Sequence, residues 1–156
     1  MTLTLTQEEV GKRVALLKRL KATLSRQREK FQSYLRVLDA ERASINGASV
    51  DALKVQVELE EELVVDIHAI QKVIDPLEAV LQQTYHGAED DEVLDLRSTL
   101  DQLKVQVQQK SEENRGLLAK SLASLGGEIV RLRPQVRGNN PYTGQRPSSS
   151  LVDITT

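Results

Sequence analysis

The residues of this sequence that could do chemistry are few and scattered. The two histidines, His68 and His86, stand eighteen residues apart, and neither has a carboxylate or a second histidine at metal-ligand spacing on the same helical face. The chain contains no cysteine, which excludes disulfides and thiolate metal sites. Catalysis needs titratable groups that converge in one pocket, and these positions offer none. We therefore expect no catalytic residue, no cofactor and no metal ion.

Two acidic clusters and one glycine pair are the other candidates for a ligand site. The clusters at 58–62 and 89–92 lack the alternating loop pattern that Ca²⁺ requires, so we interpret them as a solvated helix face and a helix start. Gly126 and Gly127 are followed by Glu128, whereas a phosphate-binding loop continues with Lys and Ser or Thr. None of these motifs indicates an enzyme.

Charge is divided unevenly along the chain, although the net charge is only −2. Residues 1–48 carry a net +5, residues 49–92 a net −10 and residues 93–133 a net +2. The basic block lacks the interleaved aromatic residues that favour nucleic-acid binding, and we expect the acidic block to cover it, so we predict no nucleic-acid partner. Opposite blocks indicate two antiparallel helices that pair, each exposed ion pair contributing only about 0–1 kcal/mol.

Helical periodicity organises the positions between these groups, beginning with a capping box at Thr6 and Glu9 that opens a first helix. Apolar residues then recur every seven positions, which predicts a left-handed supercoiled seam. The members of this heptad row are Val10, Leu17, Leu24, Phe31, Leu38 and Ile45. A second row beside it is interrupted by arginines. Asn46 and Gly47 are predicted to end the helix because both tolerate the left-handed conformation of a C-cap.

A second helix is predicted from Ser49, with Asp51 in its first turn to complement the helix dipole. Its apolar positions form two adjoining stripes, and so broad a face implies contact with two neighbours, so we expect this helix to lie at the centre. The stripes are Leu53, Val57, Val64, Ile67, Ile74 and Leu81, and beside them Leu63, Ile70 and Leu77. Pro76 predicts a kink or a short break within one rod, since the stripe keeps its phase across it, or else a fresh helix start with Asp75 as N-cap.

A third helix is predicted to open with the acidic run 89–92 and to end before Pro134. Its apolar stripe is interrupted by a polar stretch at 108–115 and then resumes as Leu117, Leu118, Leu122, Leu125, Ile129 and Leu132. The sequence thus predicts an all-α, elongated antiparallel bundle of three long helices over residues 1–133. A flexible polar tail is expected over residues 134–156, because its proline and serine content disfavours packing.

Some features of this plan leave alternatives open. The resumed stripe of the third helix either packs on the first helix or offers a surface to a partner helix. The short apolar patch from Leu151 to Ile154 is either a docking peptide or a frayed terminus. The heptad seam can pair within one chain or between chains, so it leaves the oligomeric state open. No stretch reaches the roughly 18 apolar residues of a membrane span, and we expect no signal peptide.

Several motifs together resemble those of the FlgN-type flagellar export chaperones. They are the turn Asn46-Gly47-Ala48-Ser49-Val50-Asp51-Ala52-Leu53, the step Glu61-Glu62-Leu63 in the second helix, the run Asn114-Arg115-Gly116-Leu117-Leu118-Ala119-Lys120-Ser121-Leu122 with Leu125, and Pro141-Tyr142-Thr143-Gly144 in the tail. The resemblance covers most of the chain. Pro76 and the Gly126-Gly127 pair depart from the family pattern.

The resemblance implies a cytoplasmic protein that binds the C-terminal helical segments of hook-filament junction proteins. Such a chaperone keeps its clients unpolymerised and delivers them to the type III export machinery. The client-binding region of the family lies toward the C-terminus, which points here to Asn114, Leu117, Leu118, Ser121, Leu122 and Leu125, and the apolar stripe adds Ile129 and Leu132. The alternative is a structural coiled-coil scaffold or tether without a client, which the strict heptad row would also suit.

Overall fold

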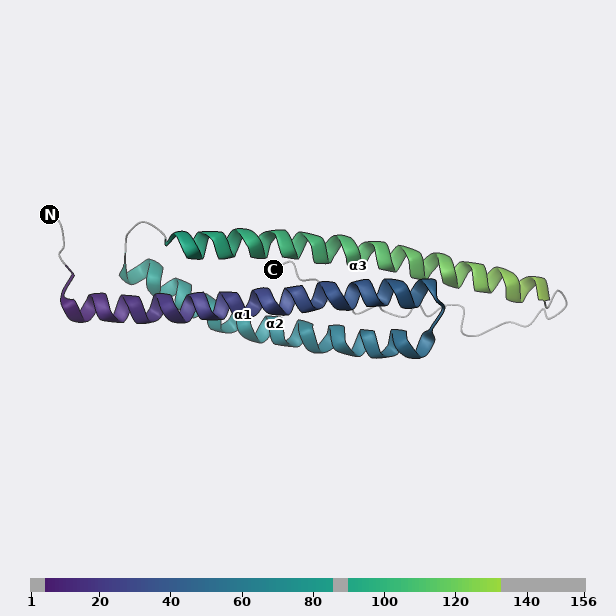
Figure 1. Ribbon diagram of the computed structural model, residues 1–156, viewed down its shortest axis with the longest axis horizontal. Helices are drawn as coiled ribbons and strands as arrows, with labels where there is room; N and C mark the ends of the chain where they lie inside the picture. Colours follow the sequence, from purple (N-terminus) through teal and green to yellow (C-terminus); the bar gives the residue numbers. More distant parts are fainter. Residues whose placement is uncertain (1–4, 86–89, 133–156) are drawn as a thin grey trace.

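A computed structural model describes residues 5–85 and 90–132 of the chain, with side chains as far as Gly126. It contains three long helices, α1 (Gln7–Asn46), α2 (Val50–Thr84) and α3 (Asp91–Leu132). They form an elongated bundle in which α2 runs antiparallel to α1 and α3 (Figure 1). The predicted all-α bundle is therefore confirmed. The predicted tail over 134–156 and His86 lie outside the described residues.

The start of α1 has the predicted capping box. The backbone N–H of Glu9 donates to Thr6 Oγ1 at 3.2 Å, and the Thr6 N–H donates to Glu9 Oε2 at 2.8 Å. The bond from the Thr6 N–H, followed by the one from its side chain, lowers the pKa of the Glu9 carboxyl. Two of the otherwise unpaired donors at this helix end are thus satisfied reciprocally.

Helix α1 ends at the predicted place, but a different residue of the α1–α2 turn adopts the left-handed conformation. Gly47 keeps right-handed helical angles with φ −84°, and Ala48 takes the left-handed conformation with φ 53°. The Ser49 N–H donates to the Ser44 carbonyl at 3.0 Å and the Ala48 N–H to the Ile45 carbonyl at 3.2 Å. These two bonds define a Schellman motif with Ala48 at C′. The prediction that Asn46 or Gly47 would hold the left-handed conformation is wrong.

The central helix of the bundle is α1, which packs against both α2 and α3. The prediction that the second helix lies at the centre is therefore wrong. A second row of α1, formed by Leu20, Gln27 and Tyr34, is as deeply buried as the heptad row. Its polar member Gln27 is only 2% exposed and donates to Gln71 Oε1 at 2.8 Å. The sequence indicated a second row interrupted by arginines, whereas in the structure the buried residue between Leu20 and Tyr34 is Gln27.

One hydrophobic core runs along the bundle and takes residues from all three helices. Its buried members are Leu20, Leu24, Phe31, Tyr34, Leu38, Val64, Ile67, Ile70, Ile74, Leu77, Val93, Leu96, Leu100, Leu103 and Val107. Helix α2 passes through Pro76 without a break, so the alternative of a fresh helix start does not occur. None of the described helices contains an apolar stretch that could cross a membrane.

The charge blocks pair less simply than predicted. Between α1 and α2, Lys30 forms an ion pair with Asp66 at 2.9 Å. The start of α3 also binds α1, where Lys21 contacts Asp90 at 3.0 Å. Most of the acidic cluster on α2 instead faces solvent, namely Glu58, Glu61 and Glu62. The prediction that this acidic cluster forms a solvated helix face is wrong for Glu60, which is only 7% exposed.

Candidate protein-binding surface

Three polar contacts between α1 and α3 share one offset along the sequence. Lys21 contacts Glu92 at 3.1 Å, Arg42 contacts Glu113 at 3.4 Å, and Lys110 pairs with Asp39. The two partners of each contact are 71 residues apart, which is the signature of two parallel helices in register. With this offset, Asn46 at the end of α1 lies opposite about residue 117. We refer to residues 118–132 as the α3 overhang, and Figure 1 shows this part of α3 extending past the α1–α2 turn.

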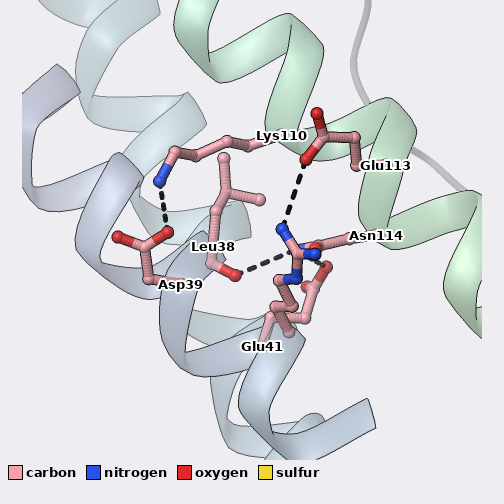
Figure 2. Close-up of polar contacts among 7 residues, drawn as sticks. Leu38, Asp39, Glu41, Lys110, Glu113 and Asn114 are labelled. Atoms are coloured by element: carbon pink, nitrogen blue, oxygen red, sulfur yellow. Dashed lines mark hydrogen bonds and ion pairs between the residues drawn. The ribbon is translucent and has the colours of Figure 1, made fainter. Parts of the chain in front are cut away.

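Asn114 ties α3 to the last turns of α1, just before the overhang. Its side chain is 2% exposed, and its Nδ2 donates to the Leu38 carbonyl at 2.9 Å and to Glu41 Oε1 at 3.1 Å (Figure 2). The Lys110–Asp39 and Glu113–Arg42 contacts join the same turns of α1 and α3. Asn114 was predicted as a partner-binding residue, but in this structure its side chain faces α1 inside the bundle.

The buried carboxyl group of Glu60, on α2, is linked to the contacts around Asn114 through its hydrogen bond with Glu41. Burial, then the hydrogen bond and the negative charge of Glu41, raise the pKa of Glu60 to about 9. Burial beside Glu41 thus favours the protonated form of Glu60. Nearby, burial and then the charge of Glu60 raise the pKa of Tyr34 to about 12, while its hydrogen bond with Ser111 acts in the opposite direction.

The sequence contained a signal for the burial of Glu60. It stands seven residues before Ile67 and fourteen before Ile74, in line with the buried apolar row of α2. Heptad spacing places such residues on one side of a supercoiled helix. The composition of the cluster around Glu60 nevertheless favoured the interpretation as a solvated face.

The α3 overhang exposes apolar side chains. Leu122 is 56% exposed and Leu125 is 52% exposed, so the alternative in which this stripe packs on α1 does not hold for these two leucines. Leu117, Leu118 and Ser121 are half-buried. Ile129 and Leu132 belong to α3, but their side chains lie outside the described residues.

Two leucines of the overhang, the half-buried Leu118 and the exposed Leu125, continue the side of α3 that is buried in the bundle. Leu118 and Leu125 follow Val107 and Asn114 by eleven residues, which is about three turns of helix. Both upstream residues are at most 2% exposed. The same side of α3 is therefore covered by α1 along the bundle, and beyond about residue 117, where α1 has ended, no other described helix covers it.

This arrangement suits protein binding. An exposed apolar helix face is a typical docking surface for another amphipathic helix. In the described part of the chain, no three His, Cys, Asp or Glu side chains gather as metal ligands would. His68 is half-buried on α2.

Comparison with known proteins identifies the family. The family model for the FlgN protein matches residues 16–146, which is most of the chain. A protein of Treponema pallidum (strain Nichols), described as an uncharacterized protein, is 36% identical over 148 residues, covering 95% of this chain and 94% of its own length. No solved structure gives a significant match. The chain belongs to the FlgN family of flagellar export chaperones.

Proposed function

We propose that the α3 overhang binds an amphipathic helix near the C-terminus of a hook-filament junction protein. The complex forms in the cytoplasm, keeps the client from polymerising and holds it ready for the type III export machinery. The observation that carries the proposal is the uncovered apolar side of α3 beyond the end of α1, with Leu122 and Leu125 more than half exposed. Family membership supports a protein client in general.

The mechanism follows from the fact that α1 ends before the overhang begins. Along the bundle, α1 covers the apolar side of α3, and a client helix takes the corresponding position beyond Asn46. Full burial of a leucine stabilises the complex by about 1.5–3 kcal/mol. Burial of a few leucines of the overhang therefore supplies much of the binding free energy of a complex of moderate affinity. While bound, the client's apolar side cannot pair with other copies of the client.

The scaffold alternative is less well supported by the packing. It relied on the heptad row of α1 as a seam between chains. Leu24, Phe31 and Leu38 of that row are at most 2% exposed because α2 and α3 of the same chain cover them. Little of this seam is left for another chain along the bundle.

The proposal is tested by co-purification with the C-terminal segment of a hook-filament junction protein from the same genome. The double variant Leu122→Glu/Leu125→Glu should lose client binding, because two charges replace the apolar contacts. A chain that stops after Leu117 should lose it too. The matched control is Val65→Glu on α2, a valine that is 67% exposed, and this variant should bind like the unmodified chain.

Two further comparisons make the result decisive. The substitution variants should keep the helical circular dichroism of the unmodified chain, because the substituted side chains lie at the surface. A chain that stops after Arg133 should still bind, since it keeps all of α3. Normal binding by the double glutamate variant, or loss of binding on removal of residues 134–156 alone, would place the client elsewhere.

A further inference from the structure

At the opposite end of the bundle, α1 has a stretch that the described part of α3 does not cover, although Tyr85 at the end of α2 contacts Glu9 and Arg13 there. With the offset of 71 residues, the first residue of α3, Asp91, lies opposite about residue 20 of α1. Residues 7–19 therefore have no α3 beside them, and Figure 1 shows α1 extending beyond the start of α3. On this stretch Val10 is 44% exposed and Val14 is 59% exposed.

These valines lie on the side of α1 that α3 covers farther along. Val14 stands seven residues, or two helical turns, before Lys21, which contacts Asp90 and Glu92 at the start of α3. Val10 belongs to the same heptad row as Leu38, whose carbonyl accepts a hydrogen bond from Asn114 of α3. Positions seven residues apart share a side of a supercoiled helix. The uncovered end of α1 is thus a continuation of its own α3-binding side.

We propose that the α3 overhang of one copy packs along residues 7–19 of α1 in a second copy, head to tail. The two surfaces are the two unpaired ends of one interface, since α1 lacks α3 at its beginning and α3 lacks α1 at its end. A second copy shifted along the bundle axis therefore presents α1 to the overhang in the same parallel orientation that exists within each chain.

The lengths of the two surfaces agree. Residues 7–19 and residues 118–132 each make about four helical turns, or roughly 20 Å of helix. A contact between two helices of this length lies at the small end of protein interfaces. The association should therefore be weak and should increase with concentration. Because the contact joins two different surfaces, each copy keeps one free surface, and further copies can add to it.

One consequence of this contact rests on the proposed function. A client helix and a second copy would occupy the same leucines of the overhang, so they compete. Chaperone without client would associate with itself, and client binding would release single chains. The self-association itself does not depend on client binding and can be tested without a client.

Sedimentation equilibrium of purified chains tests the head-to-tail contact. The weight-average mass of the unmodified chain should rise with concentration. Val14→Glu should lose this rise because its α1 surface is charged, and Leu125→Glu should lose it because its overhang is charged. An equimolar mixture of the two variants should form pairs of chains and nothing larger, because each variant retains one intact surface. Val65→Glu, altered on α2, should associate like the unmodified chain.

The outcomes separate this contact from its alternatives. An unmodified chain whose mass stays that of one chain up to its solubility limit contradicts the proposal. So does a Val14→Glu variant that still associates, because two overhangs must then pair with each other. Client binding is measured on the same variants: Val14→Glu should keep it and Leu125→Glu should weaken it. If both bind client normally, the proposed function fails while the result on self-association stands.

Discussion

At the residue scale, the main feature is a set of polar side chains inside the helical seams. A buried polar group is costly unless it is hydrogen-bonded, and Gln27 and Asn114 each bond to a neighbouring helix. A single asparagine in a seam is a known way to fix the register of paired helices. Asn114 is therefore placed to set where α1 ends along α3, and so where the overhang begins.

Glu60 gives the bundle a stability that depends on pH. Its pKa is about 9 in the folded protein, against an ordinary value of 4.5. The folded state thus binds more protons between these values, and the free energy of unfolding falls as pH rises through this window. Glu60→Gln keeps a neutral side chain, so between about pH 5 and pH 8 it should gain stability over the unmodified chain, by up to about 1.4 kcal/mol per pH unit.

Urea unfolding at a series of pH values measures this difference. The matched control is Glu58→Gln, an exposed residue on the same helix, whose stability should follow the unmodified chain at every pH. Parallel pH profiles for Glu60→Gln and the unmodified chain would show that Glu60 is ionised in the folded bundle.

At the element scale, the turn between α1 and α2 carries strain that a single substitution can relieve. Ala48 holds φ 53°, a left-handed conformation that costs a residue with a Cβ about 1–2 kcal/mol. Ala48→Gly removes this cost and loses part of the gain to the greater freedom of the unfolded chain. We predict a net stabilisation of about 1 kcal/mol, measured by urea or thermal unfolding.

The control for this prediction is Ala22→Gly, at an exposed position inside α1. There the same substitution should destabilise by about 1 kcal/mol, because glycine is a poor helix former. A loss of stability in Ala48→Gly would mean that the turn does not hold Ala48 in the left-handed region.

The elements themselves could largely be predicted from the sequence. The capping box at Thr6, the stop after Asn46 and the start near Ser49 are local signals, and each depends on a few neighbouring residues. The continuity of α2 through Pro76 followed from the phase of its apolar stripe. The left-handed residue was misplaced because alanine is rarely found in that conformation, while glycine and asparagine stood next to it.

At the scale of the whole molecule, the arrangement of the helices was harder to predict. Periodicity shows which side of a helix is buried, but it does not show which helix covers it. The second buried row of α1 contains Gln27, and the buried row of α2 contains Glu60. Apolar periodicity therefore underestimates the width of the buried face of α1 and assigns Glu60 to the solvated face of α2. The constant offset between α1 and α3 depends on pairs far apart in sequence, such as Arg42 with Glu113, which periodicity alone does not reveal.

For the candidate site, too, the local pattern could be predicted from the sequence and the packing could not. The stripe from Leu117 onward is a periodic pattern in the sequence, and the family resemblance implies that it contains client-binding residues. Its exposure was not visible, because exposure follows from where α1 ends relative to α3. Asn114, Leu122 and Leu125 stand close together in sequence, yet the first lies inside the bundle and the other two lie beyond its end.

Hydrogen exchange of the backbone amides, with and without the C-terminal helical segment of a hook-filament junction protein, tests the central claim most directly. Amides of residues 118–132 have no covering helix in the free chain and should exchange quickly. We predict that client binding slows their exchange, while the amides of α1 and α2 in the core of the bundle keep their rates. Protection confined to α1 or α2, with the α3 overhang unchanged, would contradict the assignment of the overhang as the client-binding surface.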